Sequence, residues 1–289
     1  MIQQLLSVRV VARQQEATDV CSFELADPEG RALPGFNAGA HIDVQVRDGL
    51  IRQYSLCNAP GEQHRYRIAV LREASGRGGS IALHDQIQQG DLINISAPRN
   101  HFPLAPGASR TVLLGGGIGV TPILCMAQQL AQANADFEMH YCTRSADRTA
   151  FADHIRQSSF ADRVIFHRDD GDPAQKFDAA AVLANPVSGT HIYVCGPAGF
   201  MDYVLKTAKQ LGWPDAQVHR EYFAAAPQQG GVAQEFEVQI ASTGQVLVIT
   251  ADKAIAEVLM EHNIDITTSC DQGVCGTCLT SVLEGEPDH

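Results

Sequence analysis

Three cysteines near the end of the sequence, Cys270, Cys275 and Cys278, follow the spacing C-x4-C-x2-C. This spacing is typical of plant-type [2Fe–2S] clusters, which take a fourth cysteine further along the chain. Gly273 and Gly276 let backbone N–H groups approach the sulfurs. A zinc site or three unrelated thiols are the alternatives, but the full spacing in a glycine-bearing loop favours iron and sulfur. The printed sequence has no later cysteine, which predicts an absent or labile cluster in this chain.

Two segments in the first hundred residues have the groups that a flavin requires. Arg52-Gln53-Tyr54-Ser55-Leu56 reads as a strand, on which Arg52 and Tyr54 share one face. Arg77-Gly78-Gly79-Ser80 is a glycine-rich turn that opens a helical stretch. An aromatic ring can support the flavin ring, and cations with backbone N–H groups can hold its phosphate. An ordinary strand and a plain loop are the alternatives, and the spacing leaves FMN and FAD both open.

A third motif, Gly115-Gly116-Gly117-Ile118-Gly119-Val120-Thr121-Pro122, lies where a predicted strand passes into a predicted helix. It departs from the G-x-G-x-x-G fingerprint because position 120 is valine. The glycines would still let a pyrophosphate approach the helix N-terminus, where the helix dipole favours anions. The motif therefore predicts a dinucleotide site, with a tight turn that binds nothing as the alternative.

Two further segments follow predicted strands of the same region. Cys195-Gly196-Pro197 follows one strand at its carboxyl end, where open α/β sheets bind ligands, although a lone cysteine is more often a buried thiol. Cys142-Thr143-Arg144-Ser145 ends another strand without an acidic residue to hold a ribose 2′-hydroxyl. Arg144 would even suit a 2′-phosphate, so these residues leave NADH and NADPH both open.

The elements that would position these motifs change in kind along the chain. In residues 1–103, short segments of alternating apolar and polar residues, separated by turns, predict a small antiparallel β-barrel. In residues 104–224, strands that alternate with helices predict a parallel, doubly wound sheet. Residues 225–234 read as a linker. Residues 235–289 begin with a hairpin that turns at Thr243-Gly244, followed by a helix with Asp252 as a possible cap and Ile255, Val258, Leu259 and His262 on one face.

The composition limits the function. A formal net charge of -12 argues against a nucleic-acid partner, and no apolar run is long enough for a membrane span. The start lacks the features of a signal peptide, so we expect a cytoplasmic protein. The five cysteines outside the cluster motif are expected to be buried thiols: Cys21, Cys57, Cys125, Cys142 and Cys195. His101, His140 and His167 are expected to be surface or packing residues rather than metal ligands.

With these motifs in this order, the chain resembles the phthalate dioxygenase reductase family, the flavin and iron–sulfur reductases of Rieske oxygenases that include vanillate demethylase reductase. The resemblance covers a flavin barrel, a nucleotide domain and a β-grasp ferredoxin domain that is incomplete here. Family members continue for about thirty residues past Glu284-Gly285-Glu286-Pro287-Asp288-His289 and supply the fourth cysteine there. Truncation of a longer protein is therefore the expectation.

The resemblance also assigns site residues. It places Cys195 at the nicotinamide and Glu221 and Phe223 close to the flavin, and these three residues form the implied catalytic group. It places Cys270, Cys275 and Cys278 at the iron–sulfur cluster. For FMN the implied residues are Arg52, Tyr54, Ser55, Ala69, Leu71, Arg77, Gly78, Gly79, Ser80 and Thr121. For NADH they are Gly115, Gly116, Gly117, Gly119, Thr121, Arg144, Ser145, Cys195, Gly196 and Pro197.

The implied activity is a redox relay in a monomer. NADH gives a hydride to FMN, and single electrons pass through a [2Fe–2S] cluster to a Rieske-type oxygenase, with the cofactors supplying the redox chemistry. In the chain as printed, flavin reduction is expected to survive and delivery to the oxygenase to fail. The alternatives are a stand-alone NAD(P)H:flavin reductase without a functional cluster and, from another class, a flavin or metal redox sensor.

Overall fold

The computed structural model describes residues 5–47, 50–76, 78–223, 234–264, 266, 278 and 280–285. They fall into two compact units, one within residues 1–223 and the other within residues 224–289. Among these residues no helix is long and apolar enough to cross a membrane.

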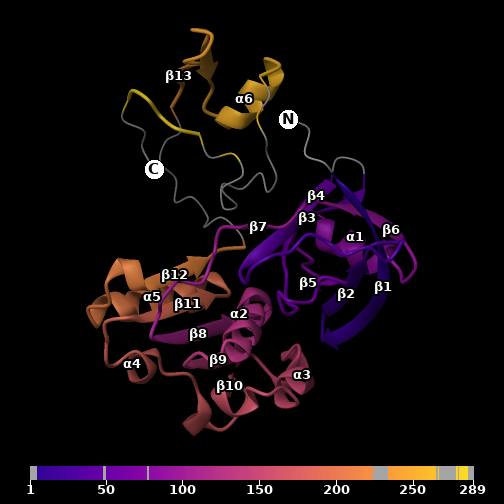
Figure 1. Ribbon diagram of the computed structural model, residues 1–289. Coiled ribbons are helices and arrows are strands. Elements are labelled where there is room, and N and C mark those ends of the chain that lie inside the picture. Colours follow the sequence, from indigo (N-terminus) through magenta and orange to yellow (C-terminus); the bar gives the residue numbers. More distant parts are fainter. Residues whose placement is uncertain are drawn as a thin grey trace. The chain divides into compact units, whose positions relative to one another are not determined.

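The first part of the larger unit is the predicted antiparallel sheet, with strand order β4-β3-β6-β1-β2-β5 and β7 paired to β3 (Figure 1). An isolated bridge between Leu56 and Ile68 joins the end of β4 to β5, which brings the two edges of the sheet together. The prediction of a small barrel is confirmed. Its elements are β1 (Leu6–Ala17), β2 (Val20–Ala26), β3 (Ala40–Arg47), β4 (Leu50–Ser55), β5 (Tyr66–Leu71), α1 (Gly79–Gln86), β6 (Leu92–Ile95) and β7 (Arg99–Asn100).

Alternation along the strands explains the barrel core. Phe23 and Leu25 of β2 and Ile42 and Val44 of β3 are fully buried, and all four belong to one apolar cluster. The residues between them face outward, because successive side chains of a strand point to opposite faces. Asp43 is such an outward residue, and other parts of the chain cover it, since it is buried.

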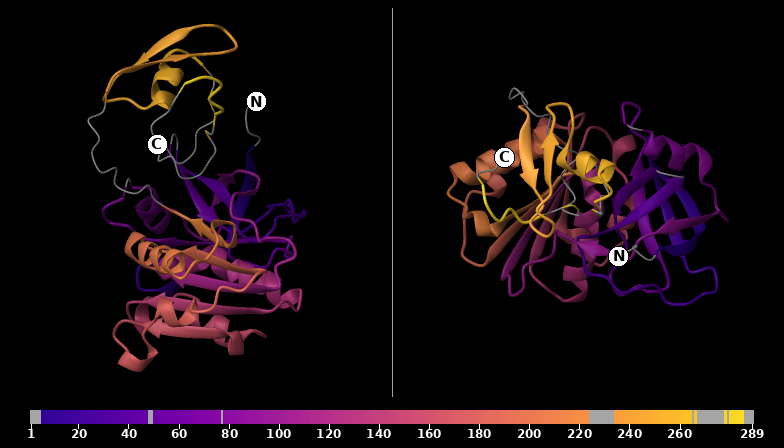
Figure 2. Two further views of the ribbon diagram at one scale, coloured as in Figure 1. Left: turned by 90° about the vertical axis from the view of Figure 1, so that its left-hand side faces the viewer. Right: turned by 90° about the horizontal axis from the view of Figure 1, so that it is seen from above.

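The second part of the larger unit is a parallel sheet with strand order β10-β9-β8-β11-β12. The order reverses between β8 and β11, and such switch points are where open α/β sheets bind ligands. Figure 2 shows the sheet with helices on both of its faces. Its strands are β8 (Arg110–Gly116), β9 (Phe137–Thr143), β10 (Val164–Arg168), β11 (Thr190–Cys195) and β12 (Val218–Glu221), and its helices are α2 (Val120–Gln132), α3 (Ala152–Arg156), α4 (Ala179–Val182) and α5 (Ala198–Gln210).

The two faces of this sheet bury different helices. Leu113 and Tyr193 pack in the cluster that contains α2 and α3, whereas Val112 and Val194 pack with α4 and α5. Because strands buried on both faces need apolar residues at every position, β8 and β11 read as nearly continuous apolar runs.

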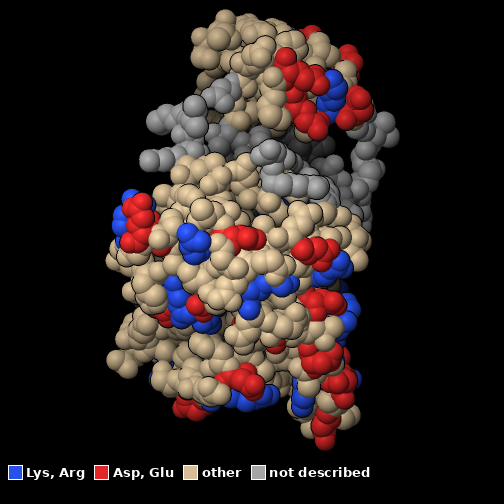
Figure 3. All heavy atoms as spheres, turned by 90° about the vertical axis from the view of Figure 1, so that its right-hand side faces the viewer, with Lys and Arg blue, Asp and Glu red and all other residues tan. Residues whose placement is uncertain are grey.

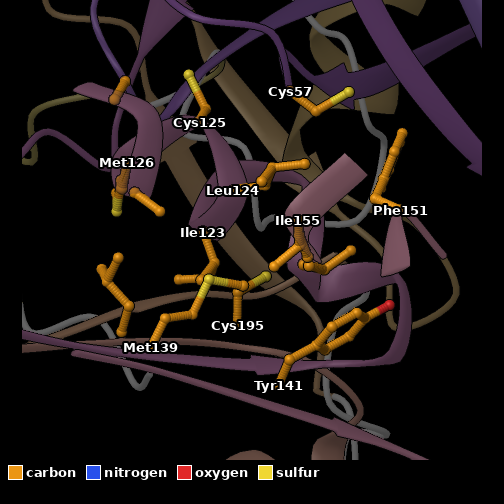
Figure 4. Close-up of a cluster of buried hydrophobic side chains, with 14 of the residues drawn as sticks. Cys57, Ile123, Leu124, Cys125, Met126, Met139, Tyr141, Phe151, Ile155 and Cys195 are labelled. Carbon is orange, nitrogen blue, oxygen red and sulfur yellow. The ribbon is translucent and has the colours of Figure 1, made fainter. Parts of the chain in front are cut away.

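Helix α2 joins the barrel to the parallel sheet. Its apolar side packs Ile123, Leu124 and Met126 into a cluster that also holds Cys57 of the barrel, as the close-up in Figure 4 shows. The Gln128 amide donates a hydrogen bond to the Cys57 carbonyl at 2.8 Å, and Cys125 Sγ donates one to the Asn58 carbonyl at 3.1 Å. The barrel and the parallel sheet therefore share one core.

The smaller unit contains the predicted hairpin, β13 (Phe236–Gln239) and β14 (Val246–Ile249), and the helix α6 (Ile255–Glu261). The backbone turns through Gly244, whose φ of 74° suits glycine. Two details of the prediction are wrong. The residue that precedes the helix is Ala254 rather than Asp252, and its N–H donates to the Glu257 carboxylate at 2.8 Å.

The second wrong detail concerns the apolar face of α6. Val258 and Leu259 are buried, but Ile255 is 43% exposed. His262 is also exposed. A seven-residue helix that packs against two short strands buries only its central turn, so the residues at its two ends stay exposed to solvent. The predicted linker, except for Gln234, lies outside the described residues.

Candidate functional site

The two predicted flavin segments meet in space. Arg52 of β4 lies against Gly79 at the start of α1, so closely that a Cβ on Gly79 would be 2.5 Å from Arg52 Cγ and 2.8 Å from its Nε. Gly78 precedes the helix with a φ of 80°, a left-handed conformation that favours glycine. The glycines thus make room for the guanidinium beside the first N–H groups of α1. This cradle suits a phosphate, which cations and helix N-termini both attract. Arg77 lies outside the described residues.

The other predicted flavin residues lie on the strands around this cradle. Tyr54 is half-buried beside the barrel core, and burial raises the pKa of its phenol, so the ring stays neutral. Ala69 is buried on β5 and Leu71 half-buried. The Ser80 hydroxyl accepts a hydrogen bond from the Glu73 N–H at 3.1 Å, which ties the turn to the residues after β5.

The glycine-rich motif at residues 115–122 and the Cys195-Gly196-Pro197 segment are in close contact at the switch point between β8 and β11. A Cβ on Gly119 would stand 2.3 Å from the Cys195 carbonyl oxygen and 2.6 Å from the Gly196 nitrogen. A Cβ on Gly116 would be 2.8 Å from Phe200 and 3.0 Å from Pro197. Both contacts require glycine, so the bare backbone of the loop lies at the carboxyl ends of β8 and β11, as a pyrophosphate site requires.

One hydrogen bond connects the flavin strand with the nucleotide sheet. Ser55 Oγ, at the end of β4, donates to Glu221 Oε2, at the end of β12, over 3.4 Å. Burial raises the pKa of the Glu221 carboxyl to about 8, and the bond from Ser55 opposes this rise. Glu221 therefore holds a proton at neutral pH. It is aligned with Cys195 in the β11–β12 ladder.

The Cys195 thiol is buried, and burial followed by the nearby Glu221 raises its pKa well above the usual range. It is therefore a neutral thiol at the switch point rather than a nucleophilic thiolate. Thr121 is also buried, and its hydroxyl donates to the Ile118 carbonyl at 3.1 Å. Phe223, two residues after Glu221, is by contrast 43% exposed.

Sequence reasoning missed an acidic residue near the tip of β9. Arg144 is exposed there, while the Ser145 hydroxyl donates to Asp147. The other oxygen of Asp147 accepts a hydrogen bond from the Thr18 hydroxyl at 2.8 Å, and the bonds from Ser145 and Thr18 hold the pKa of this carboxyl low. Asp147 stands only two residues beyond Ser145, so a longer window after the strand would have included it.

Of the predicted cluster ligands, Cys278 is described and half-buried, whereas Cys270 and Cys275 lie outside the described residues. Within the described part of the chain, no three His, Cys, Asp or Glu side chains gather as metal ligands. Four of the five other cysteines are buried as predicted, but Cys142 is only partly so. His140 and His167 are packing residues, hydrogen-bonded to each other at 2.9 Å, and His101 is exposed.

Three family models match successive parts of the chain. An oxidoreductase FAD-binding domain matches residues 7–103, the N-terminal domain of a dimethylamine monooxygenase subunit DmmA-like family matches residues 94–218, and a 2Fe-2S iron-sulfur cluster binding domain matches residues 238–289.

Whole-length relatives agree. The chain is 55% identical over 284 residues to a vanillate O-demethylase oxidoreductase of Pseudomonas putida, covering 98% of this chain and 89% of the relative. It is 40% identical to a phthalate dioxygenase reductase of Burkholderia cepacia, covering 98% and 88%. A solved structure of phthalate dioxygenase reductase, described as a modular structure for electron transfer from pyridine nucleotides to [2Fe-2S], aligns with a TM-score of 0.79 over 99% of this chain and 88% of that one.

Proposed function

The chain belongs to the family of reductases that contains phthalate dioxygenase reductase and vanillate O-demethylase oxidoreductase, and on that premise we propose that it carries electrons from NADH through FMN and a [2Fe–2S] cluster to a Rieske-type oxygenase. Electron transfer from NAD(P)H through a flavin and an iron–sulfur cluster is the activity of this family. Membership in it sets the sensor alternative aside. NADH, FMN and the identity of each binding residue are the finer parts of the proposal.

The hydrogen bond from Ser55 to Glu221 carries the proposal, because it joins the flavin strand to β12 of the nucleotide sheet, where Glu221 lies beside Cys195 of β11. A flavin, when bound, accepts a hydride and releases electrons singly. Arg52 and the N–H groups after Gly78 would hold its phosphate, and Tyr54 and Phe223 would flank its ring. Gly117, Gly119 and the Cys195-Gly196-Pro197 segment would hold the pyridine nucleotide.

NADH is proposed over NADPH because of Asp147. The Ser145 hydroxyl is already engaged by the Asp147 carboxylate, and that charge would repel a 2′-phosphate placed between Ser145 and Arg144. FMN is proposed on the likeness to phthalate dioxygenase reductase, since the FAD-binding family model does not separate the two flavins.

Domain boundaries, cluster ligands and quaternary structure complete the proposal. We assign residues 1–103 to the flavin, 104–224 to the nucleotide, 225–234 to a linker and 235–289 to the ferredoxin domain, with Cys270, Cys275 and Cys278 on the cluster. A monomer that docks to an oxygenase, without nucleic acid or membrane, is expected.

Surface charge supports the proposed partner. Figure 3 shows Lys and Arg intermixed with Asp and Glu on the visible face of the larger unit. In residues 235–289, Lys253 is the one Lys or Arg among many Asp and Glu. A negative ferredoxin domain fits an oxygenase with a basic docking surface, because opposite charges steer association.

The experiment that tests the function is anaerobic titration with NADH. The purified protein should be yellow and should bleach with one equivalent of NADH, and mass spectrometry of the released flavin should identify FMN. A colourless protein that binds no flavin on reconstitution would contradict the proposal. Bleaching by NADPH at the same rate would correct the nucleotide assignment.

The raised pKa of Glu221 predicts how stability depends on pH. The folded carboxyl keeps its proton up to about pH 8, whereas the unfolded one loses it near 4.5. Stability from this group is therefore complete below pH 4.5 and is lost as pH rises toward 8, by up to about 1.4 kcal/mol per pH unit. Glu221→Gln should remove this pH dependence. The free energy of unfolding of the variant, measured with urea, should therefore rise relative to that of the parent between pH 5 and 8.

The control is Glu29→Gln, which changes an exposed carboxylate. Its unfolding free energy should follow that of the parent protein across the same range. Parallel curves for Glu221→Gln and the parent would show that Glu221 is charged in the folded state, against the prediction.

A further inference from the structure

The tip of the β1–β2 hairpin of the barrel contacts the loop that follows β9. The Thr18 N–H donates a hydrogen bond to the Asp147 carbonyl at 2.7 Å, and the Thr18 hydroxyl donates one to Asp147 Oδ2 at 2.8 Å. Beside them, the Arg148 guanidinium pairs with the Asp19 carboxylate at 3.5 Å. The barrel therefore contacts the nucleotide part at this loop as well as along α2.

The hairpin tip is a fixed support for this contact. Ala17 and Val20 are paired with each other, so only Thr18 and Asp19 form the turn. Asp19 has a φ of 62°, a left-handed conformation that aspartate adopts more readily than most residues. Its carbonyl accepts a hydrogen bond from the Arg72 N–H at 2.7 Å, which ties the turn to the residue after β5. The Thr18 hydroxyl is thus held in one place relative to the barrel.

The loop after β9 is also held from the side of the sheet. The Thr149 hydroxyl donates to the Ser145 carbonyl at 2.8 Å and lies 2.8 Å from the Thr143 hydroxyl. Thr143 and Thr149 are both buried. Because Ser145 and Thr18 each engage one oxygen of Asp147, the carboxylate is fixed between the sheet and the barrel.

The charge of Asp147 lies where open α/β sheets select their nucleotide. In such sheets an acidic residue some distance after the glycine loop binds the ribose 2′-hydroxyl, or a nearby arginine accommodates a 2′-phosphate. Asp147 and the exposed Arg144 offer both kinds of group on one loop. The bonds from Ser145 and Thr18 keep the pKa of the Asp147 carboxyl low, so it is charged at neutral pH. The direction in which this carboxylate points therefore decides what the loop accepts.

We propose that Thr18 is a positioning residue for nucleotide choice: its hydroxyl keeps the Asp147 carboxylate beside Ser145, and this arrangement disfavours a 2′-phosphate. The inference rests on the proposed function and adds to it a residue of the flavin barrel that enforces the preference for NADH. Thr18 acts through Asp147 and does not touch the nucleotide.

Loss of the Thr18 hydroxyl should release the carboxylate. Asp147 is exposed, so its side chain can then turn toward water and leave Ser145. The Ser145 hydroxyl and the Arg144 guanidinium are then free to hold a 2′-phosphate through strong, charge-assisted hydrogen bonds. The loop itself should stay in place, because the bonds from the Thr18 N–H and the Thr149 hydroxyl do not involve the Asp147 carboxylate.

The test is calorimetric titration of the flavin-containing protein with adenosine 2′,5′-bisphosphate and with adenosine 5′-monophosphate, neither of which takes part in redox chemistry. Thr18→Val should raise the affinity for the bisphosphate about fivefold, the factor that corresponds to one hydrogen bond, and leave the affinity for the monophosphate unchanged. Asp147→Asn should raise the affinity for the bisphosphate at least as much. The double variant should show no further rise over Asp147→Asn, because both changes act through one carboxylate.

Two control variants separate the hydroxyl from the rest of the turn. Thr18→Ser keeps the hydroxyl and should keep the parent ratio of the two affinities. Asp19→Asn removes the pair with Arg148, and asparagine suits the left-handed backbone at this position, so the ratio should again match that of the parent. If Asp19→Asn raised the affinity for the bisphosphate as much as Thr18→Val, the cause would be a looser turn or a change of charge, and the proposal would be overturned.

The outcomes distinguish this inference from the proposed function. An unchanged ratio in Thr18→Val, with the monophosphate still bound, would overturn the inference and leave the proposed function intact. A parent protein that binds neither nucleotide would instead refute the nucleotide site, and the inference with it. Steady-state kinetics gives a second readout. The KM for NADPH should fall in Thr18→Val, whereas a merely structural role would lower kcat with both nucleotides.

Discussion

Gly119→Ala is expected to lower NADH-dependent flavin reduction about 100-fold, since displacement of a reacting group by about 1 Å costs a rate of that order. The added Cβ would lie 2.3 Å from the Cys195 carbonyl oxygen and 2.4 Å from its carbon, and backbone cannot move aside as a side chain can. The loop must therefore shift away from β11. Anaerobic stopped-flow reduction measures the rate, and flavin absorbance confirms that the flavin site is still occupied.

The control is Gly199→Ala, on the first turn of α5 shortly after the same segment. A Cβ there meets nothing within 4 Å. This variant should keep the parent rate, and its stability should rise slightly, because alanine is favoured over glycine in a helix. A Gly119→Ala protein with the parent rate would show that the close approach of the two loops has no role in nucleotide binding.

Arg52→Ala is expected to weaken flavin binding about 30-fold, which corresponds to about 2 kcal/mol for a lost charge-assisted hydrogen bond. Arg52 lies against Gly79, at the cradle where the phosphate is proposed. Titration of the flavin-free protein by fluorescence quenching gives the Kd. Arg52→Lys should recover only part of the affinity, because lysine keeps the charge but lacks the planar group.

Arg9→Ala provides the comparison for that experiment. Arg9 is an exposed arginine of β1 that donates to the Gly90 carbonyl at 3.0 Å. Its removal changes the net charge equally and should leave the Kd unchanged. If both variants lost affinity equally, the effect would come from overall charge rather than from the cradle.

The elements of the larger unit could be predicted from the sequence because pattern and environment agree. Strands β8 and β11 are nearly continuous apolar runs after their first two residues and are buried on both faces, and β2 alternates because only one of its faces meets the barrel core. The helix α6 was predicted less well. Its apolar spacing is that of a longer helix, and with seven residues it buries only Val258 and Leu259.

The site was predictable where a single segment holds the signal. The Gly119 loop and the Cys195 segment each stand out in the sequence, and the structure brings them together. The contribution of Asp147 could not be predicted in this way. It depends on Thr18, which is 129 residues away in the sequence, and only the fold places these two residues side by side.

The shared core around α2 has a consequence for engineering chimeric reductases. The FAD-binding family model ends at residue 103, but Cys57 and Leu124 pack in one cluster across that point. A cut there would expose apolar surface on both fragments, so each fragment would tend to aggregate. When a flavin and nucleotide unit is exchanged between oxygenase systems, residues 1–223 should therefore be transferred together as one unit.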